Sequence, residues 1–243
     1  MSSLEGRTVI ITGASSGIGE ETARLLASQG THVVIGARRV ERLEALASEI
    51  QTDGGSVAFQ RLDVTELEQM QEIIKLAQSH FGRIDAIVNN AGVMPLSPLE
   101  ALKIEEWNQM IDVNIRGVLH GIAAGLPVMK KQGFGQFINV ASIGAYEVSP
   151  TAAVYSATKY AVRAITDGLR QETAGQNIRV TLVSPGVTES ELPDSITHKD
   201  TIDFMKEYRR IALPAESIAR SIAFAIEQPS DVDVNEMVIR PLV

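Results

Sequence analysis

The chain has 243 residues, 44% of them apolar and 21% charged, which is the composition of an ordinary folded protein rather than a disordered one. Its net charge of −8 argues against a surface that binds nucleic acid or anionic membranes. The chain has no cysteine and only four scattered histidines, so disulfides and thiolate sites are excluded and we predict no metal site. We find neither a secretory leader nor an apolar run of membrane-spanning length, and therefore predict a cytoplasmic protein.

The first motif along the chain is a strand followed by a glycine-rich turn. A β-branched apolar run at 8–12 predicts a buried parallel strand, and GASSGIG at 13–19 leads into a helical pattern that stops at Gly30. Glycines let the backbone approach a pyrophosphate, and the N–H groups of a helix start attract its charge. The spacing is not the usual Gly-x-Gly-x-x-Gly, and a tight connection alone would also explain it. The strand–turn–helix context favours a nucleotide site.

The second predicted strand, 32–37, is followed by two arginines and a helix from about Glu41. In dinucleotide-binding folds the end of this strand meets the adenosine ribose, where a carboxylate would hold the hydroxyls of NAD. Here Ala37 is followed by Arg38 and Arg39, whose guanidinium groups match a phosphate. We therefore predict NADP(H) as the cofactor. The alternative is that both arginines belong to the solvated start of the next helix.

The third and fourth predicted strands, 57–62 and 86–92, also end in polar residues. Asp63 could accept a hydrogen bond from the adenine amino group, or could cap the helix at 66–81 directly or through Thr65. The two asparagines of NNAG suggest a turn that lets the chain pass close to the cofactor, although such residues are common in ordinary turns.

A long helical region is predicted at 104–132, with Asn114 inside it. Asparagine is a poor helix former, because its side chain competes for backbone hydrogen bonds. The amide could interrupt the helix and organise water toward Lys159, or it could be an ordinary surface residue.

The most informative stretch follows the fifth strand, 136–142, which ends at Ser142. Tyr155 and Lys159 are four apart in a predicted helix, so they lie on one face. A cation about 4 Å from the phenol would be worth roughly 4 kcal/mol at an effective dielectric of 20, or on the order of three pKa units. That would bring a tyrosine near working pH, and Ser142 could hold a carbonyl oxygen beside it. Taken alone, the pair could equally be a solvated amphipathic pair.

The last part of the chain begins with a sixth strand, 179–184, which ends at a Pro-Gly pair. The segment at about 187–212 has polar and acidic residues with isolated apolar ones, and a stretch of that length in an α/β domain is often a substrate lid. A helix at 214–228 and a strand at 236–241 are predicted to close the chain.

The order and spacing of these motifs resemble those of one family. The motifs are TGASSGIG at 12–19, Asp63, NNAG at 89–92, Asn114, Ser142, YSATK at 155–159 and PG at 185–186. Over essentially its full length the chain resembles the short-chain dehydrogenases/reductases, above all small microbial NADP-dependent members that reduce ketones, aldehydes or 3-oxo acids. The resemblance implies one α/β Rossmann-type domain over residues 1–243, with about seven parallel strands flanked by helices, and a homodimer or homotetramer.

The resemblance also implies roles for individual residues. Tyr155 would be the general acid and base, Lys159 would lower its pKa and hold the nicotinamide ribose, Ser142 would orient the carbonyl, and Asn114 would hold a relay water. The implied cofactor residues are Gly13, Ser15, Ser16, Gly17, Ile18, Gly19, Arg38, Arg39, Asp63, Val64, Asn90, Ala91, Gly92, Tyr155, Lys159, Pro185, Gly186, Val187 and Thr188.

The expected activity is that of an NADPH-dependent carbonyl reductase, reversible as an alcohol dehydrogenase, acting on a small molecule. The alternatives are a 3-hydroxy acid dehydrogenase of the same fold and a non-catalytic NADP-binding sensor. A hydroxy-acid enzyme would need an arginine in the pocket to hold the substrate carboxylate, for which the candidates are Arg209, Arg210 and Arg240. If the family geometry holds, the pocket is also expected to be faced by Met94, Tyr146, Glu147 and Val148.

Overall fold

Seven parallel strands form one sheet in the computed structural model, which describes residues 4–242. Their spatial order is β3-β2-β1-β4-β5-β6-β7. The strands are β1 (Thr8–Thr12), β2 (His32–Ala37), β3 (Ser56–Arg61), β4 (Ala86–Asn89), β5 (Gly135–Val140), β6 (Ile178–Pro185) and β7 (Glu236–Ile239). This is the predicted Rossmann-type sheet. The outermost limits of the predicted domain, residues 1 and 243, lie outside the described residues.

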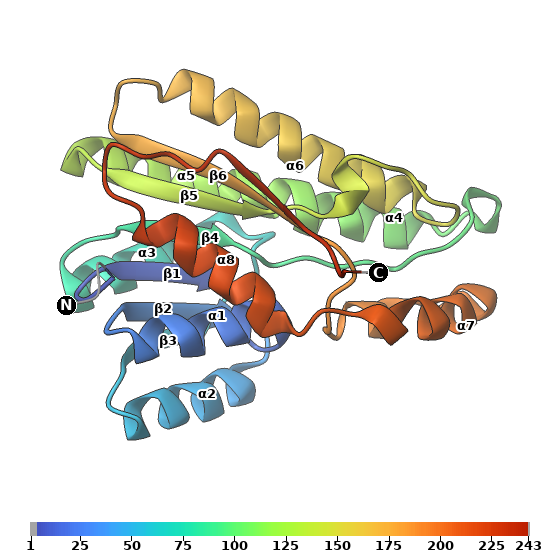
Figure 1. Cartoon of the computed structure of the whole chain (residues 1–243), viewed down its shortest axis with the longest axis horizontal. Coiled ribbons are helices and arrows are strands. Elements are labelled where there is room, and N and C mark those ends of the chain that lie inside the picture. The colour runs from blue at the N-terminus through green and yellow to red at the C-terminus, as the bar shows by residue number, and fades with distance from the viewer. Residues whose placement is uncertain (1–3, 243) are drawn as a thin grey trace.

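Helices cover both faces of the sheet (Figure 1). Helices α1, α2 and α8 lie on one face, and α3, α5 and α6 lie on the other. The helices are α1 (Gly17–Ser28), α2 (Val40–Thr52), α3 (Leu67–Phe81), α4 (Ile104–Met110), α5 (Gly117–Gln132), α6 (Ala153–Glu172), α7 (Lys199–Tyr208) and α8 (Ala215–Glu227). Within residues 4–242, no helix combines the length and apolar character needed to cross a bilayer.

The apolar run of β1 shows how the two-sided core forms. Val9 and Ile11 point to one face and pack in the cluster that contains Ile222 of α8. Ile10 points to the other face, in the cluster that contains Ile73 of α3. All three strand residues are fully buried. Successive side chains of a strand alternate between faces, so a strand that is covered on both sides must be apolar at every position.

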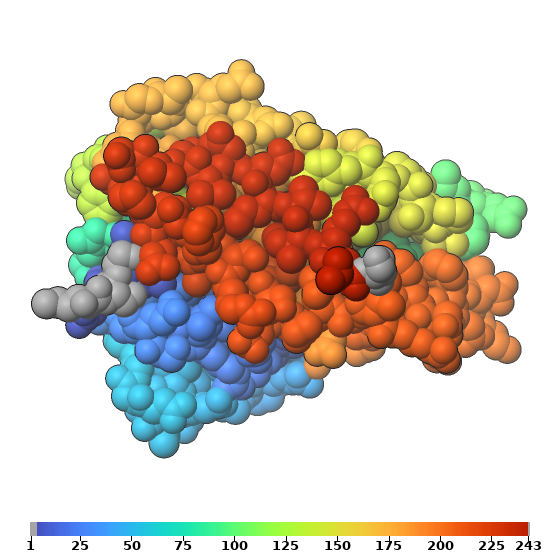
Figure 2. Space-filling view, in the orientation of Figure 1, coloured from blue at the N-terminus to red at the C-terminus, as the bar shows by residue number. Residues whose placement is uncertain are grey.

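The order of the strands creates a cleft at one end of the sheet. The chain builds outward from β1 to β3 and then returns to place β4 on the other side of β1. The connections leaving β1 and β4 therefore diverge to opposite faces, which opens a crevice at the carboxyl ends of these two strands. In the space-filling view, α7 (orange) and the residues near 100 (green) project from the same end of the molecule (Figure 2).

Three predicted elements differ from the structure. Strand β4 ends at Asn89 rather than at residue 92, because the next residues turn away to bond the end of β1. The helix predicted over 104–132 changes to a π-helix at Ile111–Arg116, which is the predicted interruption around Asn114. Residues 187–212 contain the ten-residue helix α7, which we did not predict. Its inward residues, Thr201 and Met205, are four apart and buried, a signal hidden by the polar residues around them.

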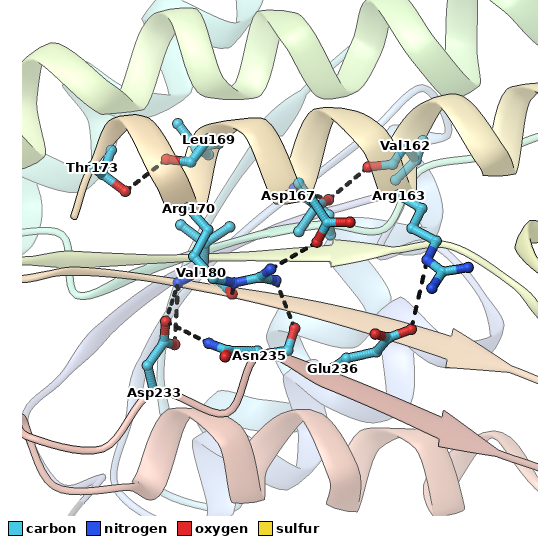
Figure 3. Close-up of polar contacts among 12 residues, drawn as sticks. Val162, Arg163, Asp167, Leu169, Arg170, Thr173, Val180, Asp233, Asn235 and Glu236 are labelled. Carbon is cyan, nitrogen blue, oxygen red and sulfur yellow. Dashed lines mark hydrogen bonds and ion pairs between the residues drawn. The ribbon is translucent and has the colours of Figure 1, made fainter.

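Polar contacts fix the edge strand β7 to helix α6 (Figure 3). The Arg170 guanidinium donates to the carbonyl oxygens of Val180 at 3.1 Å and Asn235 at 2.8 Å, and pairs with Asp167 at 2.7 Å. The Asp233 carboxylate accepts from the Val180 N–H at 3.3 Å. One arginine on α6 therefore ties together β6 and the chain that leads into β7.

Arg170→Met is expected to lower the free energy of unfolding by about 1–3 kcal/mol, because two carbonyl groups lose a charged donor. Chemical denaturation would measure the change. Arg220→Met is the matched control, since Arg220 makes only exposed contacts, with Glu216 and Ser217, and its loss should cost no more than about 0.5 kcal/mol. Equal effects of the two substitutions would contradict the role of Arg170.

Candidate active site and cofactor cleft

The turn after β1 is locked to the turn after β4. Gly13 has a φ of +69°, and a Cβ added to it would lie 2.8 Å from the Cα of Ala91. A Cβ on Gly19 would lie 2.6 Å from the side-chain nitrogen of Asn90, which donates to the carbonyl oxygens of Thr12 at 2.9 Å and Gly13 at 3.3 Å. The Thr12 hydroxyl accepts from the N–H groups of Asn90 and Ala91, both at 3.1 Å. Only glycine fits these two positions, and Thr12 is a structural residue to which the sequence analysis gave no role.

Two adjoining cavities lie along this end of the sheet and share wall residues such as Ile18 and Gly92. The larger has a volume of about 510 Å³, and the predicted cofactor residues that line it are Gly13, Ser15, Ser16, Gly17, Ile18, Arg38, Arg39, Asp63, Val64, Asn90, Ala91 and Gly92. The smaller, about 200 Å³, is lined by Ser142, Tyr155, Lys159, Pro185, Gly186, Val187 and Thr188 among others. Two predicted residues lie behind these walls, Gly19 under the glycine turn and Asn114 under the chain after β4.

Asp63 lines the larger cavity and also holds a turn. One carboxylate oxygen accepts from the Thr65 N–H at 3.0 Å and from the Thr65 hydroxyl at 2.8 Å. Burial would raise the pKa of Asp63, but the Thr65 hydrogen bonds and the charges of Arg38 and Arg61 outweigh it and lower the pKa. Asp63 is thus a charged acceptor at the cavity wall. The predicted capping of α3 by Asp63 or Thr65 is not found, because the N-cap residue is Glu66 and no side chain accepts from the first turn of the helix.

The two predicted arginines differ in their surroundings. Arg38 is exposed at the cavity rim. Arg39 donates from Nε and Nη2 to the Ser15 hydroxyl at 3.2 and 3.0 Å, and from Nη2 to the Ser16 hydroxyl at 3.0 Å. Its Nη1 pairs with Glu191 at 2.7 Å. Arg39 therefore lies against the glycine-rich turn, while it is also the N-cap of α2 and its side chain stays 40% exposed, as the alternative expected.

Ser142, Tyr155 and Lys159 come together in the smaller cavity. Tyr155 and Lys159 are on α6 and are only 8% and 5% exposed. Ser142 follows β5, its hydroxyl accepts from the Gly144 N–H at 3.1 Å, and it lies close enough to the Tyr155 phenol to affect the pKa of that group. The Lys159 ammonium donates to the Val140 carbonyl oxygen at 3.0 Å. The pair is buried at the cavity wall, which excludes the solvated amphipathic pair.

Burial sets the acidity of both groups on α6. It raises the pKa of Tyr155, and the hydrogen bond from Ser142 offsets only part of that rise. Burial also lowers the pKa of Lys159 to about 8. The predicted lowering of the tyrosine pKa by Lys159 is not found here, because the Lys159 Nζ lies 5.7 Å from the ring centroid and bonds Val140 instead. Burial also makes the phenolate costly to form, an effect that the spacing of the two residues does not reveal.

Asn114 is buried and fully bonded, which excludes the surface position. Its side-chain oxygen accepts from the Val93 N–H at 2.9 Å, and its nitrogen donates to the Val93 carbonyl oxygen at 3.0 Å and the Thr158 hydroxyl at 3.1 Å. The Thr158 hydroxyl in turn donates to the Tyr155 carbonyl oxygen at 2.6 Å. Asn114 thus joins the chain after β4 to the first turns of α6.

Only one of the three candidate arginines lines the smaller cavity. Arg209 does so, and its Nη2 donates to the Ser190 carbonyl oxygen at 2.7 Å. Arg210 instead pairs with Glu207 at 3.0 Å on the exposed surface. Arg240 pairs with Glu147 at 3.4 Å.

The remaining pocket predictions divide in the same way. Met94 and Glu147 line the smaller cavity as expected, while Val148 is 62% exposed and lies outside it. Tyr146 also points elsewhere, and its hydroxyl bonds Ser184 at 3.2 Å and the Glu236 carboxylate. Both partners, one on β6 and one on β7, are distant from Tyr146 in the sequence, so spacing along the chain does not reveal these contacts.

The comparisons with known proteins agree with this geometry. A family model described as short chain dehydrogenase matches residues 7–201. The chain belongs to the short-chain dehydrogenase/reductase family. A Staphylococcus saprophyticus protein named as an uncharacterized oxidoreductase is 51% identical over 99% of this chain and 98% of its own.

Two solved structures are also similar to this family member. An alcohol dehydrogenase from the archaeon Thermococcus sibiricus, complexed with 5-hydroxy-NADP, is 33% identical, with a TM-score of 0.86 over 97% of both chains. A short-chain dehydrogenase/reductase from Burkholderia phymatum, in complex with NAD, is 25% identical, with a TM-score of 0.90 over 98% of this chain and 90% of its own. The chain is thus an oxidoreductase of this family.

The buried charge of Lys159 predicts an unusual dependence of stability on pH. The folded pKa of about 8 lies below the ordinary 10.5, so the unfolded chain holds more protons between these values. Stability relative to Lys159→Met should be lowest below pH 8 and rise by on the order of 3 kcal/mol toward pH 10.5. Denaturant unfolding of both proteins at several pH values measures the difference. Parallel curves would show that Lys159 titrates normally.

Proposed function

We propose that this protein is an NADPH-dependent reductase of ketones and aldehydes, which also runs in reverse as an alcohol dehydrogenase. The observation that carries the proposal is that Ser142 and the buried Tyr155 and Lys159 line a small cavity that adjoins the glycine-lined cleft. A protein that only senses NADP has no need for a buried tyrosine and lysine at the wall of a second cavity.

The larger cavity fits a dinucleotide on its own features. Its wall contains the glycine-rich turn and the N-terminus of α1, whose free N–H groups can hold a pyrophosphate. Arg39 and the hydroxyls of Ser15 and Ser16 form a cluster of donors beside that turn. Such donors suit a 2′-phosphate, which supports NADP(H) over NAD(H). When bound, the cofactor supplies or accepts the hydride.

The residues of the smaller cavity fit the proton half of the reaction. The Ser142 hydroxyl lies beside the Tyr155 phenol at the wall of this cavity, so both groups can bind one carbonyl oxygen. As hydride adds to the carbonyl carbon, Tyr155 passes its phenol proton to the oxygen. The raised pKa of Tyr155 keeps that proton in place near pH 7 until the carbonyl oxygen accepts it. In alcohol oxidation the same proton moves back to Tyr155.

A second candidate function is the oxidation of 3-hydroxy acids, and one observation favours it. Arg209 lines the smaller cavity and has no ion pair with a carboxylate among residues 4–242. Its charge is therefore available to hold a substrate carboxylate. In this role the segment 187–212 would act as a lid that carries the arginine.

Tyr155→Phe is expected to lower kcat for ketone reduction by about 10²–10⁴-fold, because the proton donor is lost. Binding of NADPH, measured by fluorescence titration, should change little. Tyr160→Phe removes a hydroxyl from a partly exposed tyrosine of the same helix and serves as the control. If the wild-type protein binds NADPH but turns over none of a set of ketones and aldehydes, the sensor alternative is favoured.

Arg209→Met separates the two reductase candidates. If Arg209 holds a carboxylate, KM for a short 3-hydroxy acid should rise by about tenfold or more, while KM for a simple ketone stays within about twofold. Arg210→Met is the matched control, since Arg210 is exposed and outside the cavity. Equal changes for both substrates would exclude the carboxylate role.

A further inference from the structure

A carboxylate from the 187–212 segment lies on the arginines beside the glycine-rich turn. Glu191 pairs through one oxygen with Arg39 Nη1 and through the other with Arg42 Nη1, both at 2.7 Å. Arg42 is three residues after Arg39, so both guanidinium groups leave the same side of the first turn of α2. The three residues are about equally accessible, with side chains 40%, 48% and 38% exposed for Arg39, Arg42 and Glu191.

The position of this cluster matters more than its strength. All three side chains line the larger cavity, where Arg39 also bonds the hydroxyls of Ser15 and Ser16. Hydrogen bonds from Arg39, then Arg42 and Ser16, hold the pKa of Glu191 below its usual range despite some desolvation, so it is an anion at neutral pH. Glu191 therefore uses the donors that would bind a phosphate at this point of the cleft.

A phosphate and Glu191 cannot share these donors without cost. Two anions at one arginine pair repel each other, and each guanidinium has a limited number of N–H groups facing the cavity. A cofactor with a 2′-phosphate must displace Glu191, whereas one with a 2′-hydroxyl can leave the pairs with Arg39 and Arg42 closed.

We propose that Glu191 and Arg42 determine cofactor specificity. Arg42 is an additional ligand of the 2′-phosphate, and Glu191 is an internal competitor that the phosphate displaces. This inference rests on the proposed NADP(H) preference. Displacement would also release the start of the 187–212 segment from α2. The carbonyl oxygen of Ser190, the neighbour of Glu191, accepts from Arg209 at the smaller cavity. Movement of Glu191 would therefore also affect the position of Arg209.

The test uses 2′,5′-ADP and 5′-AMP as probes, with dissociation constants from calorimetry on the full chain. Glu191→Gln should bind 2′,5′-ADP about three- to tenfold more tightly than the wild type, a modest gain because exposed ion pairs are weak. Its affinity for 5′-AMP should not change, because 5′-AMP has no 2′-phosphate to displace Glu191. Arg42→Met should bind 2′,5′-ADP several-fold more weakly. Glu189→Gln is the control. Glu189 lies two residues before Glu191, and its exposed side chain carries the same charge but lines neither cavity.

Each outcome decides the matter. A wild-type protein that prefers 2′,5′-ADP, together with a Glu191→Gln variant of unchanged or weaker affinity, overturns the role of Glu191 and leaves the proposed function intact. An equal gain in Glu189→Gln would assign the effect to net charge and also overturn it. A wild-type protein that binds both probes equally removes the NADP(H) preference itself, and the inference fails with it.

Discussion

The site depends on the bonds that join the turn after β1 to the turn after β4. Thr12 and Asn90 supply these bonds, and the absence of a side chain at Gly13 and Gly19 allows the two turns to touch. Strands β1 and β4 are neighbours in the sheet but lead to opposite faces, so without a tie their ends would diverge. The tie gives the cleft a rigid floor, and the polar atoms that remain face a ligand instead of each other.

The two ends of the cleft differ in how deeply their charged groups are buried. At the Tyr155 end, burial disfavours both the phenolate and the ammonium. It therefore raises the pKa of Tyr155 and lowers that of Lys159, which leaves a neutral acid beside a titratable cation. At the Glu191 end the charges are accessible, and paired arginines stabilise the carboxylate. The proposed proton transfer would use the first environment, and the proposed exchange of Glu191 for a phosphate would use the second.

The sequence predicted the elements whose signals are local. The strands, the glycine turn and the Tyr155–Lys159 helix follow from composition and spacing over a few residues, and all are present. What it could not predict was contact between distant segments. Tyr146 points away from the pocket because its hydroxyl bonds Glu236, which lies 90 residues further along the sequence. Arg42 had a local signal, its spacing from Arg39, but Glu191 had none, since only the folded chain brings it to α2.

The segment 187–212 links the parts of the site that the sheet keeps separate. Its start contacts α2 at the larger cavity through Glu191, and its end contributes Arg209 to the cavity of Tyr155. The buried residues of α7 attach the middle of the segment to the body of the protein, while Phe204 stays 61% exposed. Few buried side chains hold this segment, so its placement depends on ion pairs and single hydrogen bonds, which ligands can replace at little cost. A segment held in this way can respond to the cofactor and the substrate together, whereas the sheet beneath it cannot.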